Sequence, residues 1–343
     1  MAKKTILGID IGYDQLKLAL VAGGEVISTV SAAMPENLMM EGRITSRETM
    51  SELIRTTMKD NKLKANYAAV VLPNEAVYVK NVSMPQMTVD QLVYNLPFEF
   101  NDYITGEIRD YVFDYAELKD EEEAGQEACS GAEAGETTGK KMSLMAVGAQ
   151  RSVLEDAQAI LRKAGLRMKI AAPALCTYIS LIRAGKDRLY QTADEFGILD
   201  LGYEAIRLYM FRGDRHVATR VLEIGLSTLD EVISDAFGVD VHLAHTYLMN
   251  NYENCLEREE CLNAYENIAV ELMRAMNFYR FSNPDSTLSD LWLCGGGAVI
   301  RPLTDAIGEM LDMELHPAAE LVPGGASIPE CNSFVQAIGI TFE

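Results

Sequence analysis

The sequence predicts an α/β fold of two duplicated halves, with an α+β subdomain inserted into the first half. Residues 9–18 return 190 positions later as residues 199–208, and nine of the ten aligned pairs are identical or chemically alike. Each copy continues through a glycine, Gly23 or Gly213, into a further apolar stretch. Each copy therefore predicts three strands joined by tight turns, and a helix signal follows both.

Length and composition favour a globular protein of about two domains. The chain has 343 residues, of which 48% are hydrophobic and 24% charged. A formal net charge of -21 makes the average surface repel phosphate backbones, so no nucleic-acid partner is expected. The six cysteines show no CxxC pair, which is typical of a reducing compartment. Asp10 and Asp14 interrupt the first apolar stretch, so we expect a cytoplasmic protein without direct membrane insertion.

In the first half, a helix is expected after the strands of the first copy. Thr45 and Glu48 have the spacing of a capping box, and apolar side chains follow at helical spacing up to Met58. Strands are then expected at residues 68–72 and 77–82, which are rich in valine and bounded by turn residues.

Residues 66–170 form the predicted inserted subdomain. Thr88 and Ser152 are each followed three residues later by Gln or Glu, and both predict the start of a helix. Residues 110–115 and 142–147 have the alternation or apolar content of strands. Together these signals indicate a small sheet with helices on it.

An acidic segment at residues 119–141 separates the last two of these strands. It contains almost no large apolar side chain, so burial cannot offset the entropy cost of ordering it. We interpret it as a mobile loop. A partner-binding acidic tail is the alternative.

The second half repeats the plan of the first. Helices are expected at residues 227–238 and 261–281, and a strand at 290–294. A glycine turn at 295–298 then leads into another helix. A strand, a glycine turn and a helix form a geometry that lets backbone approach a ligand closely.

These elements predict a division into domains. Domain I is expected to cover residues 1–195, with its insertion, and domain II residues 196–330. A helix at 174–184 should return the chain to the first half before the repeat begins. The helix expected within 331–343 should return to domain I.

The repeated hairpins carry the chemistry that the sequence suggests. In each copy an acid and a glycine stand two positions apart, as Asp10 with Gly12 and Asp200 with Gly202. Two such hairpins facing one another across a cleft could hold a phosphate chain and its magnesium from both sides. The carboxylates would act mainly through magnesium-bound water, and the glycines would bring backbone N–H groups to the phosphates.

These motifs resemble those of the actin-like ATPase superfamily, whose two domains have a ribonuclease H-like fold. The resemblance assigns residues 10–17 to the phosphate-1 motif, 200–207 to the phosphate-2 motif and 295–298 to the adenosine motif. It implies ATP and Mg as cofactors, with Asp10 and Asp200 holding the metal. The implied cofactor-binding residues are Asp10, Gly12, Lys17, Asp200, Gly202, Gly295, Gly296, Gly297 and Ala298.

Within this superfamily the sequence is similar to the PilM family of type IV pilus assembly proteins, and more distantly to FtsA. The insertion carries this resemblance. Its matching residues are Leu72, Pro73, Pro85, Leu96, Pro97, Phe98, Glu99, Tyr103, Ile104, Asp114, Tyr115, Ala164, Gly165 and Leu166. The resemblance implies a scaffold that binds the cytoplasmic N-terminal tail of a PilN-like membrane protein, and so lies at the inner face of the cell membrane. Self-association is a further expectation.

The sequence departs from the superfamily pattern beside both phosphate motifs. Tyr13 with Asp14, and Tyr203 with Glu204, stand where small or hydroxylated residues are usual. Bulk and like charge both oppose a bound phosphate. At most a weak ATPase is expected, and a pseudo-ATPase is the alternative.

A second departure concerns the helix that contacts adenosine in relatives. The positions of a usual Glu and Lys are held here by His245 and Leu248. His242 and His245 are spaced to share one face of that helix, where they could ligate a metal or form a solvated pair. No third ligand is evident, so the solvated pair is favoured.

Three functions remain open from the sequence. The first is the PilM-like scaffold of a type IV pilus or type II secretion-like machine. The second is an ATP-dependent small-molecule kinase of the same superfamily, which would need permissive phosphate loops and a general base. The third is an FtsA-like filament-forming cell-division protein, which usually adds an amphipathic membrane helix.

Overall fold

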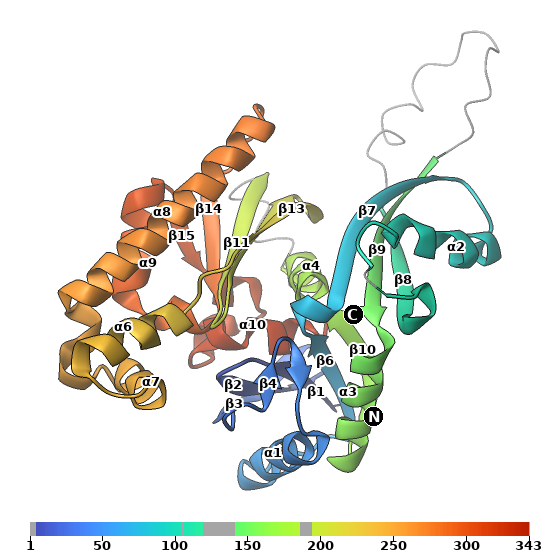
Figure 1. Cartoon of the computed structure of the whole chain (residues 1–343). Coiled ribbons are helices and arrows are strands. Elements are labelled where there is room, and N and C mark those ends of the chain that lie inside the picture. The colour runs from blue at the N-terminus through green and yellow to red at the C-terminus, as the bar shows by residue number, and fades with distance from the viewer. Residues whose placement is uncertain (1–4, 105, 119–140, 186–193, 343) are drawn as a thin grey trace.

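The computed structural model describes residues 5–104, 106–118, 141–185 and 194–342. The predicted acidic loop at 119–141 lies outside the described residues, except for Lys141. Two five-stranded sheets, each backed by helices, form the two halves of the molecule, and a smaller third sheet projects beside them (Figure 1).

The first sheet has the strand order β10-β6-β1-β2-β3. Strands β1, β2 and β3 form an antiparallel meander, whereas β6 and β10 run parallel to β1. Their bounds are β1 Thr5–Ile11, β2 Gln15–Ala22, β3 Glu25–Ala33, β6 Tyr67–Leu72 and β10 Arg167–Pro173. A short hairpin, β4 Met39–Met40 with β5 Arg43–Ile44, follows the meander.

The second sheet repeats this plan with the order β13-β12-β11-β14-β15. An antiparallel meander is again followed by two parallel strands on its other side. The bounds are β11 Glu195–Leu201, β12 Ile206–Arg212, β13 Arg215–Leu222, β14 Asp290–Cys294 and β15 Glu314–Pro317. The matching order supports the duplication that the sequence predicted.

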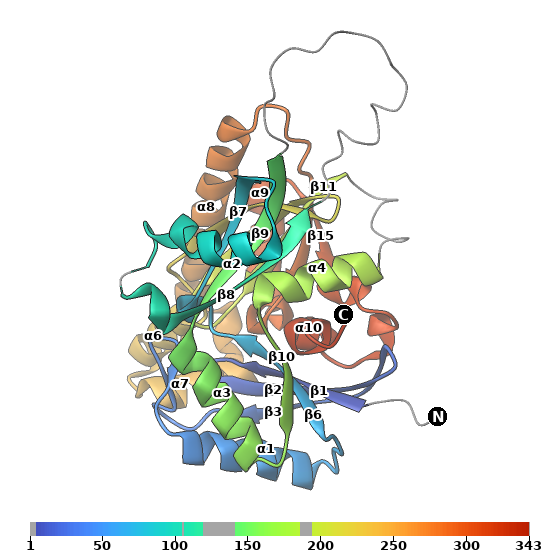
Figure 2. The ribbon, with the colours of Figure 1, turned by 90° about the vertical axis from the view of Figure 1, so that its right-hand side faces the viewer.

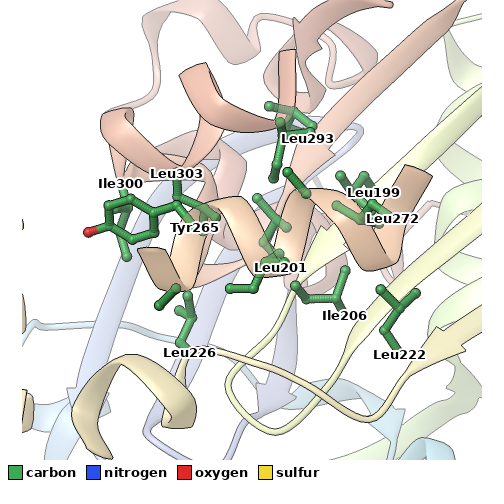
Figure 3. Close-up of a cluster of buried hydrophobic side chains, with 14 of the residues drawn as sticks. Leu199, Leu201, Ile206, Leu222, Leu226, Tyr265, Leu272, Leu293, Ile300 and Leu303 are labelled. Carbon is green, nitrogen blue, oxygen red and sulfur yellow. The ribbon is translucent and has the colours of Figure 1, made fainter. Parts of the chain in front are cut away.

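Helices cover the outer face of each sheet. On the first sheet they are α1 Arg47–Asp60 and α3 Arg151–Lys163. On the second they are α6 Ser227–Phe237, α8 Glu259–Ser282 and α9 Arg301–Leu311, with α7 Val241–Asn250 packed on α6. Leu199, Leu272 and Leu303 lie in the buried core between this second sheet and its helices (Figure 3). No helix in the described part of the chain combines membrane-spanning length with a sufficiently apolar sequence.

Two helices lie between the sheets and join the domains. They are α4 Ala174–Ala184 and α10 Cys331–Gly339, which pack on each other and share one apolar core with both sheets. Helix α10 lies so close to β1 that a Cβ at Gly8 would sit 1.7 Å from the Ala337 carbonyl oxygen. A side chain at position 8 would therefore push the connecting helix off the first sheet.

The inserted sheet has the order β7-β9-β8. Its strands are β7 Val77–Pro85, β8 Tyr111–Leu118 and β9 Lys141–Gln150, and α2 Val89–Asn95 packs on it. Short 3-10 turns fill its connections, Asn74–Ala76 before β7, Leu96–Phe100 after α2 and Ile108–Asp110 before β8. Within the expected range 66–170, β6 and β10 belong instead to the first sheet, and α3 covers that sheet. The separate inserted sheet is thus narrower than the range expected from sequence.

Two predicted helix starts are placed differently by the structure. Helix α1 is capped by Ser46, whose side chain accepts from the Thr49 backbone N–H, while the Thr45 hydroxyl donates to the Asn37 carbonyl. Helix α3 begins after Gln150 without a side-chain cap. The capping box predicted at Thr88 is present, with both of its hydrogen bonds.

Candidate functional site

The two copies of the repeated hairpin face one cleft between the domains. Asp10 and Gly12 line it at the end of β1, and Asp200 and Gly202 line it at the end of β11. Helix α10 contributes further lining residues from its side between the sheets, including Gln336. The structure therefore brings the repeated motifs together at one site.

Each hairpin places its acid directly opposite a cation. Asp10 on β1 pairs in register with Lys17 on β2, and Asp200 on β11 pairs with Arg207 on β12. Lys17 and Asp200 are buried, and the Arg207 side chain is only 14% exposed. Cross-strand pairs of opposite charge stabilise a hairpin, so the repeated charges have a structural role of their own.

Negative charge nevertheless dominates the cleft. The described residues that line it include five carboxylates, Asp10, Asp14, Glu75, Asp200 and Glu204, against the cations Lys17 and Arg207. Burial raises the pKa of the Asp10 carboxyl from 3.8 to about 6, against the opposing attraction of Lys17, and the nearby Asp200 charge adds to the rise. Burial also raises the pKa of Asp200, opposed by Arg207 and Lys17. A bound cation would relieve this uncompensated charge.

The glycine turn after β14 contributes only its first half to the cleft. Gly295 and Gly296 line it, whereas Gly297 is buried and Ala298 packs against the core of domain II. Gly295 has a φ of 87°, and a Cβ there would lie 2.6 Å from the Leu201 carbonyl oxygen. The backbone of this turn therefore demands glycine in the absence of any ligand.

An ion pair crosses the cleft and links the two domains. Arg207 Nη2 on β12 lies 3.0 Å from Glu75 Oε1, which belongs to the turn before β7. The remaining cavity is about 100 Å³, well below the roughly 300 Å³ at which pockets for drug-sized ligands begin. This conformation of the cleft is closed.

A hydrogen-bonded chain ties Asp200 to the helices between the sheets. The Gln336 side-chain amide on α10 donates to Asp200 Oδ2 at 2.8 Å and to the Tyr178 hydroxyl on α4 at 2.9 Å. The Tyr178 hydroxyl lies 3.3 Å from Cys294 Sγ. Asp200 therefore contacts both connecting helices through one glutamine, and any ligand that moved its carboxylate would act on those helices.

The two unusual tyrosines are each held by their own domain. The Tyr13 hydroxyl accepts a hydrogen bond from the Gly42 backbone N–H at 2.7 Å, in the β4-β5 hairpin. The Tyr203 hydroxyl donates to Asp230 Oδ2 at 2.8 Å. Both tyrosines line the cleft, so they occupy space beside the motifs as the sequence suggested.

The histidine pair on α7 does not form the solvated pair that we expected. His245 Nδ1 lies 2.9 Å from Asp230 Oδ2, a fully buried carboxylate on α6, and its ring packs edge-on against Tyr203. This contact raises the pKa of His245. His242 is exposed and lies 3.7 Å from Glu36 Oε1. The sequence favoured a solvated pair because the spacing of residues along α7 gives no sign of Asp230, which lies on another helix fifteen positions earlier.

A groove runs between domain I and the inserted subdomain. Two adjoining hollows form it and share Arg43 and Ser152. The outer hollow is polar and includes Asp110 and Arg151. The inner hollow has Arg43, Ser152 and Asp156 in its lining, but most of its side chains are apolar, namely Ile11, Met39, Ile44, Val70, Val71, Leu72, Pro73, Val153 and Ala157.

The groove and the cleft share part of their walls. Both are lined by Ile11, Met39 and the segment Val71, Leu72 and Pro73 at the end of β6. The turn that carries Glu75 follows this segment directly. Only a few residues therefore separate Glu75 from the walls of the groove.

Comparison with known proteins identifies the family. The sequence profile of type IV pilus assembly protein PilM matches residues 8–320. The chain belongs to the PilM family. This agrees with the resemblance to PilM proteins that the residues of the insertion suggested, and it places the chain among type IV pilus assembly proteins.

Solved structures agree with this assignment. The fold is similar to that in the structure described as the PilM-PilN type IV pilus biogenesis complex, with a TM-score of 0.80, 24% identity, and coverage of 98% of this chain and 97% of that one. It is also similar to ethanolamine utilization protein EutJ from Carboxydothermus hydrogenoformans, with a TM-score of 0.61, 12% identity, and coverage of 100% and 91%. No curated protein matches the sequence. The predicted actin-like α/β fold of PilM proteins is thus confirmed.

Proposed function

We propose that this PilM-family chain is the cytoplasmic scaffold that binds the N-terminal cytoplasmic tail of a PilN-like membrane protein. The similar structure is named for a PilM-PilN complex, which supports this choice of partner. The partner would hold the scaffold at the inner face of the membrane. The groove beside the insertion is the binding site that this proposal assigns.

The chemistry of the groove suits a short peptide. Its inner hollow offers buried or half-buried apolar side chains such as Met39, Ile44 and Val153, which would accept an apolar anchor. Its outer hollow offers charged and amide groups, including Arg43 and Gln150, which can bind a peptide backbone. An extended tail with one or two large apolar residues and polar neighbours fits both.

We propose that nucleotide binding is conditional on opening of the cleft. The acidic cleft would accept a divalent cation such as Mg, near Asp10 and Asp200, because a cation would offset the carboxylate charge gathered there. The closed cavity of about 100 Å³ does not fit ATP, and Arg207 is engaged by Glu75. ATP with Mg would therefore have to compete with the ion pair, which makes the protein at most a weak ATPase.

The decisive experiment measures tail binding to groove variants. The probe is a fluorescent peptide of the cytoplasmic N-terminal tail of the PilN-like protein from the same organism, followed by anisotropy. Val153→Arg places a charge in the inner hollow and should weaken binding by about tenfold or more. Leu262→Arg, at a 44% exposed leucine on α8 of domain II, is the control and should bind as the parent does. Equal affinity of the Val153→Arg variant would place the tail elsewhere.

A further inference from the structure

The outer face of α2 on the inserted subdomain is apolar and exposed. We define this outer face as Val89, Val93 and Tyr94 of α2 together with Phe98 of the 3-10 turn that follows it. We propose that it docks a basic amphipathic helix of a partner protein, at a second surface distinct from the groove. The assignment goes beyond tail binding, and it does not depend on the cleft.

The exposure of these side chains is high for their size. Val89 is 64% exposed, Val93 62%, Tyr94 73% and Phe98 50%. The rings of Tyr94 and Phe98 pack edge-on with their centroids 5.9 Å apart, so these two aromatic side chains form one continuous apolar surface. Helix α2 lies on the outer side of the inserted sheet, away from domain II (Figures 1 and 2).

The pattern around the helix is unusual for an exposed element. Leu92 of α2, with Leu96 and Phe100 of the following 3-10 turn, is buried against the small sheet. At 100° per residue Tyr94 lies opposite this buried side, whereas Val89 and Val93 lie along its edge, and Asp90 is the one charged position from 89 to 98. A contiguous apolar patch of this kind marks an interaction site.

The charges at the patch select the partner. Asp90 lies within the outer face and Asp102 follows its end, and neither forms an ion pair with any described residue. Lys80 of the same subdomain is engaged by Glu99. A partner segment with apolar side chains on one face and Lys or Arg beside them would pair with both free carboxylates, as helix-in-groove partners do.

The same charges argue against other occupants. A second copy of the chain carries the same net charge of -21 and would repel the acidic surroundings of the patch. Helices that lie on membranes surround their apolar face with Lys and Arg, whereas acids surround this one. The partner is therefore a protein segment of opposite charge.

The test uses a synthetic helix as the probe. A labelled peptide of about 18 residues, with Leu at positions i, i+3, i+4 and i+7 and Lys elsewhere, is titrated with the full chain in physiological salt. A matched peptide carries Glu in place of Lys. We expect the basic peptide to bind about tenfold or more tightly than the acidic one, and Val93→Ser with Phe98→Ser to weaken it by about tenfold.

The controls separate the patch from general attraction to an acidic protein. Phe281→Ser removes an aromatic ring that is 85% exposed at the end of α8, keeps the net charge, and should leave basic-peptide binding unchanged. Amide hydrogen exchange should show protection of residues 89–100 on binding, which reports on the site even if a variant folds poorly. The α2 variant should bind the PilN-like tail with the affinity of the parent, and the Val153→Arg variant should bind the basic peptide with the affinity of the parent. The two proposals can therefore fail independently of each other.

Three results would overturn the inference. The first is unchanged basic-peptide affinity in the α2 variant with no protection of α2. The second is a dimer in sedimentation velocity that the α2 substitutions dissociate, which would make a second copy the occupant. The third is co-sedimentation with vesicles of phosphatidylcholine and phosphatidylglycerol that the same substitutions abolish.

Discussion

Replacing Asp10 by Asn tests whether the cleft stores unfavourable charge. The Asp10 carboxyl pKa is about 6 in the folded protein against an ordinary value of 3.8. A carboxyl whose pKa rises on folding binds its proton more tightly in the folded state, so its ionisation destabilises that state. The cost is absent when the carboxyl is protonated in both states, grows as pH rises above the ordinary pKa of 3.8, and levels off above the folded pKa of about 6.

The magnitude follows from the two pKa values. At pH 8 the carboxyl is ionised in both states, and the difference corresponds to at most about 3 kcal/mol. At pH 5 the folded state is mostly protonated, and the cost falls to about 1.6 kcal/mol. Asp10→Asn should therefore stabilise the protein, and more so at pH 8 than at pH 5.

Urea unfolding followed by circular dichroism at the two pH values measures this effect. Asp14→Asn removes the same charge from the adjoining turn and should stabilise much less, because the Asp14 charge is the smallest of the contributions named for the raised pKa of Asp10. Added Mg should stabilise the parent and leave Asp10→Asn unaffected. The reasoning is refuted if Asp10→Asn is no more stable than the parent at pH 8, or if its gain is the same at pH 5.

Two further predictions concern the other contacts of the cleft. Glu75→Gln removes the ion pair to Arg207, so we expect the two domains to move apart. Small-angle scattering should then give a larger radius of gyration, and an unchanged scattering curve would contradict the prediction. In the opened variant, Mg with ATP should raise the melting temperature. His245→Gln should cost about 1 kcal/mol at pH 6. That cost should shrink as pH rises through the raised pKa of His245, since its interaction with Asp230 is fully present only below the ordinary pKa of 6.5. His242→Gln is the control on the same helix, and a loss independent of pH would show that the His245 charge contributes nothing.

The elements that sequence reasoning placed well are those with local signals. The repeated hairpins could be predicted because strand, turn and cross-strand charge recur together, and the structure gives both the same register. The end of α6 at Gly238 follows from the left-handed conformation of that glycine. The start of α1 was misplaced by one residue because Thr45 and Ser46 are both good capping residues. The sequence does not show that the Thr45 hydroxyl binds the Asn37 carbonyl, which leaves Ser46 as the cap.

The contacts that close the site could not be predicted in the same way. Glu75 meets Arg207 across 132 positions, and Gln336 reaches Asp200 across 136. Neither residue belongs to a motif, and each is placed by the packing of whole domains. The same holds for Asp230, whose burial beside Tyr203 depends on how α6 packs on the second sheet.

The shared walls of groove and cleft link these separate observations into one mechanism. Val71, Leu72 and Pro73 line both sites, and Glu75 follows them on the same turn. A peptide seated in the groove would fix this segment and with it the position of Glu75, which favours the closed pair with Arg207. If the tail favours the closed cleft, then a ligand that opens the cleft must weaken tail binding, and the coupling free energy is the same in both directions. Glu75→Gln should therefore loosen tail binding although position 75 lies outside the groove, and equal affinity would separate the two sites.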